Sequence, residues 1–211
     1  MVQSLPVPLP PADIVRSLGE FMEPGVPRSV WDAGCAEGRN SIHLASLGNF
    51  VLGTDISPDN LRIARQMAEF AGVAERCTFQ EGDIRNSTPP GMFDVVLLNE
   101  VTHAMPKTAA QGALRAVRSR ARQGGLNIVS GYVVRPGTAN ATNTRACFKP
   151  NELIDDYEAV GWLILDYVEE YLPNQYSGQK EHIFSRAKLI AQKPWTEPGN
   201  VIPRPRGPVL P

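Results

Sequence analysis

Cysteine is scarce in this sequence, and its arrangement argues against two classes of small protein. Cys35, Cys77 and Cys147 are the only cysteines among the 211 residues, and no two of them form a Cys-x-x-Cys pair. Disulfide-stabilised scaffolds and zinc fingers need more cysteines at close, paired spacings. The odd, scattered set indicates a reducing compartment, and we expect the protein to be cytoplasmic.

Long apolar segments and an excess of one charge are also lacking. No hydrophobic run approaches the roughly 20 residues of a membrane-spanning helix, and the proline-broken start lacks the basic residues of a signal peptide. The 21 Lys and Arg residues nearly balance the 22 Asp and Glu residues, for a formal net charge of -1. We therefore expect neither nucleic acid nor a membrane as a partner.

What the chain does have is the composition of one globular domain between two proline-rich ends. Hydrophobic residues make up 42% and charged residues 20% of the chain, which is an ordinary globular mixture. Proline concentrates in residues 1–11 and 194–211, where its fixed φ and missing N–H favour extended arms. We expect an N-terminal arm over 1–11, one domain over 12–193 and a C-terminal tail over 194–211.

Strand and helix patterns alternate within that domain. Strands separated by single helices imply a parallel sheet with helices on both faces, a Rossmann-like three-layer α/β sandwich. In such a fold, ligands bind at the carboxyl ends of the strands. The pattern predicts strands at 29–32, 50–55, 77–80, 93–98, 126–132, 162–168 and 182–192, and helices at 12–22, 39–47, 58–71, 107–122 and 151–159.

The turn after the first predicted strand, residues 32–40 (DAGCAEGRN), is the most informative segment. A dinucleotide-binding G-x-G-x-x-G motif would need glycine at 34, 36 and 39, but the chain has Gly34, Ala36 and Arg39. Gly34 allows the backbone to turn, and Gly38 allows a ligand to approach the start of the next helix. A tight turn with a glycine that only serves packing is the structural alternative.

This turn resembles the (D/E)-x-G-x-G-x-G motif of class I S-adenosylmethionine-dependent methyltransferases. Asp32, Gly34 and Gly38 match it, and Ala36 occupies the middle glycine position. The resemblance implies S-adenosylmethionine as the cofactor, S-adenosylhomocysteine as the product, and a seven-stranded, mostly parallel sheet with an antiparallel last strand. Asp32 would hold the α-ammonium group of this cofactor, whereas a dinucleotide has no cation at that position.

Acidic residues also follow the second and third predicted strands, each beside an isoleucine. Asp55 can accept hydrogen bonds from both ribose hydroxyls, with Ile56 against the adenine ring. Asp83 can accept from the adenine amino group, with Ile84 packed on the ring. Each aspartate alone could equally cap a helix or a turn. The predicted cofactor-binding residues are Asp32, Gly34, Cys35, Ala36, Gly38, Arg39, Asn40, Asp55, Ile56, Asp83, Ile84 and Asn99.

Asn99, after the fourth predicted strand, argues against one class of acceptor. Enzymes that methylate amino groups of nucleic-acid bases carry (N/D)-P-P-(Y/F) there, but Asn99 is followed by neither proline nor an aromatic residue. Methylation of a base amino group is therefore disfavoured. We expect the Asn99 backbone carbonyl to face the methionine end of the cofactor.

Three segments resemble, more narrowly, the tellurite-resistance TehB-like branch. Residues 34–41 are similar to its G-C-G-x-G-R-N-S, residues 148–153 to its F-x-x-x-E-L, and residues 182–194 to its H…LIA(R/K)KP ending. Tellurite enzymes resemble one another in a His-Arg pair before the last strand, which residues 171–176 (YLPNQY) lack. The resemblance therefore implies the cofactor and the reaction type but not the tellurite substrate.

Candidate catalytic and acceptor-binding residues follow the fourth and fifth predicted strands. Methyl transfer is an in-line displacement, in which a thiolate or chalcogen anion needs no base but a hydroxyl or amine benefits from one. The catalytic candidates are His103, Glu100 and His182, although Glu100 could instead pair with an arginine. The predicted substrate-binding residues are His103, Met105, Tyr132, Arg145 and Phe148. The histidine spacing indicates no metal site, and a catechol-type Mg²⁺ site built from scattered acidic residues stays open as an alternative.

Three hypotheses for the function follow. The first is a methyltransferase, monomeric or homodimeric, that moves the sulfonium methyl group to a small-molecule thiol, chalcogen, hydroxyl or amine. The second is a non-catalytic protein that binds the same cofactor on the same fold and acts as a regulator or scaffold. The third is a nucleotide-sugar or NAD enzyme on a similar sheet.

Overall fold

The structure is a computed structural model that describes residues 10–134, 147–171 and 185–195. Most of the two proline-rich ends, predicted as an arm over 1–11 and a tail over 194–211, lies outside the described residues.

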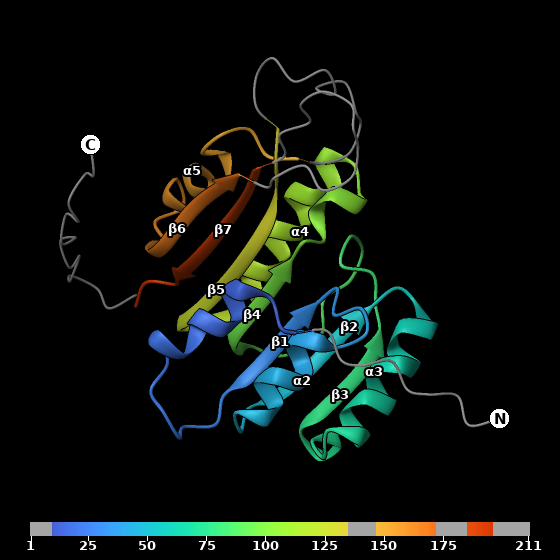
Figure 1. Cartoon of the computed structure of the whole chain (residues 1–211). Helices are drawn as coiled ribbons and strands as arrows, with labels where there is room; N and C mark the ends of the chain where they lie inside the picture. The colour runs from blue at the N-terminus through green and yellow to red at the C-terminus, as the bar shows by residue number, and fades with distance from the viewer. Residues whose placement is uncertain (1–9, 135–146, 172–184, 196–211) are drawn as a thin grey trace.

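One seven-stranded sheet runs through the described residues (Figure 1). Its strand order is β3-β2-β1-β4-β5-β7-β6. The first five strands pair in parallel, whereas β7 is antiparallel to both β5 and β6. The predicted sheet with an antiparallel last strand is confirmed. The strands are β1 (Ser29–Ala33), β2 (Phe50–Asp55), β3 (Cys77–Glu81), β4 (Phe93–Asn99), β5 (Ala121–Val133), β6 (Leu163–Tyr171) and β7 (Ser185–Gln192).

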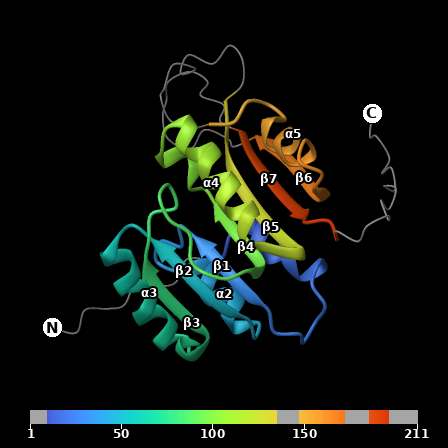
Figure 2. The same ribbon diagram turned by 180° about the vertical axis from the view of Figure 1, so that it is seen from behind.

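Helices cover both faces of this sheet, as the two opposite views show (Figures 1 and 2). On one face lie α1 (Asp13–Arg16), α2 (Arg39–Ser46) and α3 (Pro58–Phe70). On the other face lie α4 (Lys107–Arg120) and α5 (Glu152–Glu158). Short 3-10 helices over 17–20, 74–76 and 102–104 (η1, η2 and η3) complete the described elements.

The central strand β4 shows why the sequence forms three layers. Its side chains alternate between two apolar clusters: Val95 and Leu97 pack on the α1 and α2 side, and Val96 and Leu98 pack on the α4 and α5 side. All four are fully buried. An uninterrupted apolar run is therefore what a strand needs when helices cover both of its faces.

Two of the predicted helical segments end two residues earlier than expected, and the others differ by one residue at this end. The helix predicted over 12–22 is the four-residue α1 followed by η1, and the helix predicted over 107–122 ends at Arg120. Ala121 instead begins β5, pairs with Phe93 of β4 and is fully buried. Alanine is the strongest helix former and is uncommon in strands, so local preference favoured a longer helix, and the pairing with β4 overrides it.

The strand order changes direction at β1, which pairs with β2 on one side and with β4 on the other. The helices that follow β1 and β4 cover opposite faces, so the loops after these strands diverge at the carboxyl edge of the sheet. Ligands of open α/β sheets bind in the crevice at such a reversal. The fold therefore predicts the site between residues 34–38 and 99–104.

We predict that Tyr157→Phe lowers the free energy of unfolding by about 1–3 kcal/mol, because it leaves a buried amide donor unpaired. Tyr157 is fully buried in α5, and its hydroxyl oxygen accepts a hydrogen bond of 2.9 Å from Nδ2 of the buried Asn127 in β5. Urea unfolding measures the change. Tyr167→Phe is the matched control, because the partly exposed hydroxyl of Tyr167 donates to Glu169. Equal losses in both variants would contradict the prediction.

Candidate cofactor and active site

The loop between β1 and α2 has a tight, partly left-handed backbone. Gly34 and Gly38 have φ values of 76° and 81°, and Ala36 between them has a φ of 48°. The N–H groups of Gly34 and Cys35 both donate to the Thr54 carbonyl of β2, at 2.7 and 3.0 Å. Ala36 thus adopts a conformation that glycine accepts without steric strain, which explains why glycine is common in this motif position.

Both glycines also make room for neighbouring elements. A Cβ atom on Gly34 would lie 2.4 Å from Cγ2 of Val101, in the loop after β4. A Cβ atom on Gly38 would lie 3.0 Å from Cβ of Ala64 and 3.2 Å from Cζ of Phe79. Gly34 therefore lets the loops after β1 and β4 meet. The space beside Gly38 is filled by α3 and β3. This agrees with the alternative in which this glycine serves the packing of the turn.

Asp32 lies beneath this loop, buried at the end of β1. Its side chain accepts a hydrogen bond of 2.6 Å from the Ser41 hydroxyl and is 1% exposed. Burial raises the pKa of Asp32 to about 6, against the opposing effects of the Ser41 hydrogen bond and the Arg39 charge. The observed role of this carboxylate is to tie α2 to the strand end.

Asp55 joins the second strand end to the same loop. Its Oδ2 accepts from the Ala36 N–H at 3.0 Å, and its Oδ1 accepts from the Ser57 N–H at 2.9 Å. Oδ1 also accepts from Nδ2 of Asn60 at 3.4 Å. Each carboxylate oxygen can accept two hydrogen bonds, so Oδ2 retains capacity for a further donor. Ile56 beside it is 60% exposed. An exposed apolar side chain next to a half-buried carboxylate fits an adenosine, whose ring is apolar and whose ribose donates.

At the third strand end, the carboxylate is paired with an arginine. Both oxygens of Asp83 accept hydrogen bonds from the Arg85 guanidinium, at 2.7–3.0 Å. The Arg85 hydrogen bond holds the pKa of Asp83 below its ordinary value. Ile84 is buried in the core. An adenine amino group would therefore meet a carboxylate that already has a cationic partner.

After β4, two polar side chains are fixed by neighbouring elements. Asn99 Oδ1 accepts from the Ser130 hydroxyl of β5 at 2.7 Å. Glu100 has a left-handed φ of 55°, and its carboxylate lies 2.7 Å from Nη1 of Arg186 and 3.8 Å from Nη2 of Arg39. The structure thus places Glu100 in the arginine pairing that the sequence left open.

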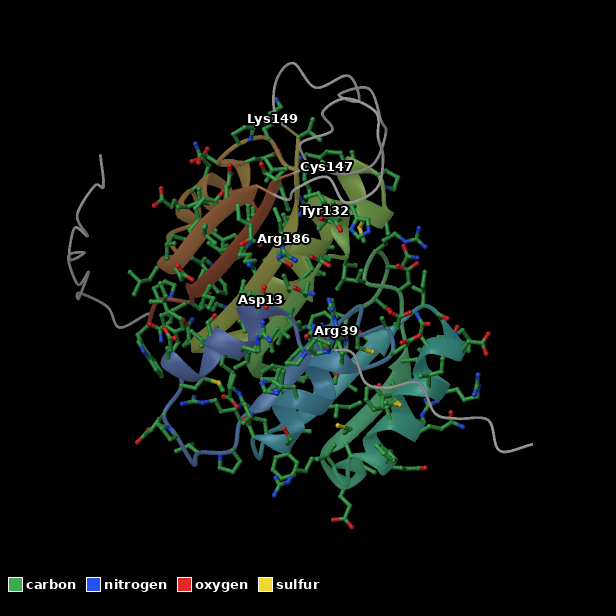
Figure 3. All side chains as sticks on the ribbon, in the orientation of Figure 1. Asp13, Arg39, Tyr132, Cys147, Lys149 and Arg186 are labelled. Carbon is green, nitrogen blue, oxygen red and sulfur yellow. The ribbon has the colours of Figure 1, made fainter. Side chains whose placement is uncertain are left out.

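The rings of His103, in η3 after β4, and Tyr132, near the end of β5, contact each other. Their rings make an edge-to-face contact with centroids 4.9 Å apart and an interplanar angle of 78°. Burial, and then the Glu100 charge, raise the pKa of Tyr132, while Arg186 opposes them. Tyr132, Arg186 and Arg39 follow one another along the face seen in Figure 3. The structure therefore brings the predicted residues His103 and Tyr132 together, beside Arg186, which is opposite Tyr132 in the sheet.

Two other predicted acceptor residues lie in the core. Met105 and Phe148 are 6% and 4% exposed and belong to the α4 and α5 cluster. Phe148 donates its N–H to the Tyr132 carbonyl at 2.8 Å, and a Cβ atom on Gly131 would lie 2.6 Å from its ring. Arg145 and His182 lie outside the described residues.

Sequence reasoning missed Arg186, the partner of Glu100. Arg186 and Lys188 alternate along β7 with Ala187 and Leu189, which are buried in the α4 and α5 cluster. This period-two pattern indicates that Arg186 faces the α1 side. The pattern could have revealed the face but not the partner, which is 86 residues away in the chain.

The described ranges contain neither a cluster of metal-ligating side chains nor a helix suited to a bilayer. Within residues 10–134, 147–171 and 185–195, no group of three or more His, Cys, Asp and Glu residues could hold a metal ion. In the same ranges, none of the helices has the length and hydropathy needed to span a bilayer.

Comparison with known proteins identifies the domain. Residues 30–125, from β1 to the start of β5, match the family described as a methyltransferase domain. This part of the chain is thus similar to a methyltransferase domain. The crystal structure of TehB from Haemophilus influenzae has the same fold, with a TM-score of 0.73 at 20% identity over 86% of this chain and 61% of that chain. The predicted domain class and its cofactor, S-adenosylmethionine, are confirmed.

Curated relatives of the methyltransferase domain differ in their acceptors. The 2-heptyl-1-hydroxyquinolin-4(1H)-one methyltransferase of Mycobacteroides abscessus is 31% identical over 101 residues, 47% of this chain and 44% of that protein. The ribosomal protein L11 methyltransferase of Geobacter metallireducens is 34% identical over 112 residues, 52% of this chain and 34% of that protein. The chain spans less than half the length of these two relatives.

We predict that Asp32→Asn raises the free energy of unfolding by about 1–3 kcal/mol at neutral pH. The native state keeps the Asp32 proton up to about pH 6, whereas the unfolded chain releases it near 3.8. Wild-type stability therefore falls relative to the variant as pH rises through this window. Urea unfolding between about pH 4 and about pH 8 measures the difference, and a difference that does not change with pH would contradict the prediction.

Asp94→Asn is the control of opposite sign. Partial burial alone would raise the pKa of Asp94, but hydrogen bonds from Ser29 and Arg122 together lower it. The native state of the wild type therefore loses stability as pH falls, and this variant is less stable at neutral pH. Its deficit shrinks as the solution is acidified.

Proposed function

We propose that the protein transfers the methyl group of S-adenosylmethionine to a small-molecule acceptor at the carboxyl edge of its sheet. The observation that carries the proposal is the connection of three strand ends at this edge. Asp55 binds the glycine loop through Ala36, and Gly34 meets Val101 of the loop after β4. The cofactor and the acceptor would lie between these loops.

The adenosyl half of the cofactor is assigned to the second strand end. Oδ2 of Asp55 has acceptor capacity left for a ribose hydroxyl, and the exposed side chain of Ile56 offers an apolar surface for adenine. The methionine half is assigned to Gly34 and to the Asn99 carbonyl. Arg85 balances the charge of Asp83, so Asp83 contributes less to adenine binding than the sequence alone predicts.

The acceptor half of the site is assigned to His103 and Tyr132. Their edge-to-face pair lies beside Glu100 and Arg186, at the ends of β4 and β5. When bound, the cofactor supplies an activated methyl group with a good leaving group. The protein must then align the acceptor and exclude water, which can contribute about 7–11 kcal/mol. His103 would remove a proton from a hydroxyl or amine acceptor.

A small-molecule acceptor is favoured over nucleic acid by charge. The chain has a formal net charge of -1, and the described acceptor half combines two aromatic rings with balanced ion pairs. A nucleic-acid site needs a surplus of cations for the phosphate groups. The name of the Mycobacteroides abscessus relative, a quinolone methyltransferase, is in line with this choice.

The direct test combines binding and turnover. Titration calorimetry with S-adenosylmethionine, S-adenosylhomocysteine and NAD checks the cofactor, and binding of NAD alone would overturn the proposal. Transfer of a labelled methyl group is then screened against thiols, phenols, hydroxyquinolones and amines, with RNA and ribosomal protein as further arms. Labelling of only a macromolecule would overturn the small-molecule acceptor. Tight binding without any transfer would favour a regulatory protein.

We predict that Asp55→Ala weakens S-adenosylhomocysteine binding by about 1–3 kcal/mol, because the ribose hydroxyls lose an acceptor and the Ala36 N–H loses its partner. Calorimetry measures the dissociation constant. Asp59→Ala is the matched control, because the Asp59 side chain is 89% exposed in the first turn of α3. An unchanged affinity in Asp55→Ala would remove this residue from the cofactor site.

We also predict that His103→Ala lowers turnover more than it lowers cofactor affinity. The ring contacts Tyr132 on the acceptor side, so its removal takes away a base or an acceptor contact and leaves the glycine loop intact. The expected decrease in kcat is about a hundredfold for a hydroxyl or amine acceptor. His43→Ala in α2 is the control, and equal turnover in both variants would exclude His103 from the reaction.

A further inference from the structure

A continuous row of charged side chains crosses the end of the sheet on the α1 side. Glu100 contacts Arg39 of α2 and Arg186 of β7, at 3.8 and 2.7 Å. Arg186 also contacts Glu170 of β6 at 2.5 Å, and Glu170 contacts Lys188 at 2.7 Å. The row therefore links the start of α2, the loop after β4 and the last two strands.

Glu100 occupies an unfavourable backbone conformation within this row. Its φ of 55° lies in the left-handed region, where the side chain of a non-glycine residue is crowded by the following carbonyl. Such residues persist where surrounding contacts hold them. The Glu100 N–H donates to the Ser130 carbonyl at 3.0 Å, and its carboxylate is held by the two arginines.

Arg186 makes the shorter of the two arginine contacts, in partly buried surroundings. The side chains of Arg186 and Glu100 are each 22% exposed. Ion pairs with limited exposure are less screened by water than surface pairs. Burial alone would lower the pKa of Arg186, but hydrogen bonds to Glu100 and Glu170 raise it. The guanidinium is thus a permanent cation that its neighbours fix in place.

The donors of Arg186 point to positioning and not to acceptor binding. Nη1 donates to Glu100, while Nε and Nη2 donate to the same oxygen of Glu170. Two carboxylates of the protein already neutralise this one guanidinium. A side chain held by two neighbouring carboxylates is suited to fixing their positions.

We propose that Arg186 is a positioning residue, which holds Glu100 in its left-handed conformation and so fixes the loop over residues 99–104. That loop carries Asn99 towards the cofactor half of the site and His103 towards the acceptor half. The inference rests on the proposed function for the meaning of those halves. It requires that Arg186 affects the site only by holding Glu100 in place.

A double-mutant cycle tests this dependence. Arg186→Gln and Glu100→Gln should each weaken S-adenosylhomocysteine binding by about tenfold, and the double variant should be no weaker than the weaker single variant. Arg186→Lys should restore part of the affinity, because an ammonium can still pair with Glu100. If the loss of affinity in the double variant equals the product of the losses in the two single variants, the residues act independently and the inference is overturned.

Arg122→Gln controls for the general loss of an ion pair. Arg122 also lies on the sheet, in β5, but pairs with Asp94 near the amino end of β4. We expect this variant to lower the thermal midpoint without changing S-adenosylhomocysteine affinity. If its affinity falls as much as that of Arg186→Gln, the Arg186 effect is one of stability alone, and the inference is wrong.

Hydrogen exchange separates this inference from the proposed function. In Arg186→Gln and in Glu100→Gln, the amides of the 99–105 segment should exchange several times faster than in wild type, with Arg122→Gln unchanged. Unchanged exchange in both variants would overturn the inference even if the wild type binds the cofactor. Failure of the wild type to bind S-adenosylhomocysteine would overturn the proposed function, and exchange alone would then decide whether Arg186 holds the loop.

Discussion

The position of the candidate site at the carboxyl edge of the sheet depends on the reversal of strand order at β1. Because β1 pairs with β2 on one side and β4 on the other, the chain leaves these strands towards opposite faces of the sheet. The loops diverge there but still meet at Gly34, where a Cβ atom would overlap Val101. Apolar clusters fill both faces of the sheet below this edge. The cofactor loop and the acceptor side can therefore be neighbours without being consecutive in the chain.

The sequence predicted most of this fold because its signals are local. The apolar run of β4, the glycines after the helices and the acidic strand ends all lie within a few residues of the structure they specify. The same holds for Asp55, whose contacts with Ala36 and Ser57 bring together two adjacent connections. The early end of α4 was missed because Ala121 favours a helix intrinsically, and its pairing with Phe93 in the sheet overrides that preference.

Side-chain partners across the sheet could not be predicted in the same way. The pairing of Glu100 with Arg186 depends on the register of β5 with β7, where Tyr132 is opposite Arg186. A shift of one residue would turn Arg186 to the other face. Met105 and Phe148 were predicted at the acceptor site because they follow strand ends, but the structure packs both into the core. The position of a residue in the chain predicts that it lies at the carboxyl edge of the sheet. Strand register and burial decide whether its side chain faces the site.

Arg39 connects the two halves of the site. It is the first residue of α2, directly after Gly38 of the cofactor loop, and its guanidinium reaches the Glu100 carboxylate beyond β4. In-line methyl transfer requires donor and acceptor to be aligned within about 0.5 Å, so two separately anchored loops must also be fixed relative to each other. The contact of Ala36 with Asp55 anchors one loop, and the contact of Glu100 with Arg186 anchors the other. Because Arg39 joins them, a displacement of either loop changes the electrostatic surroundings of the other.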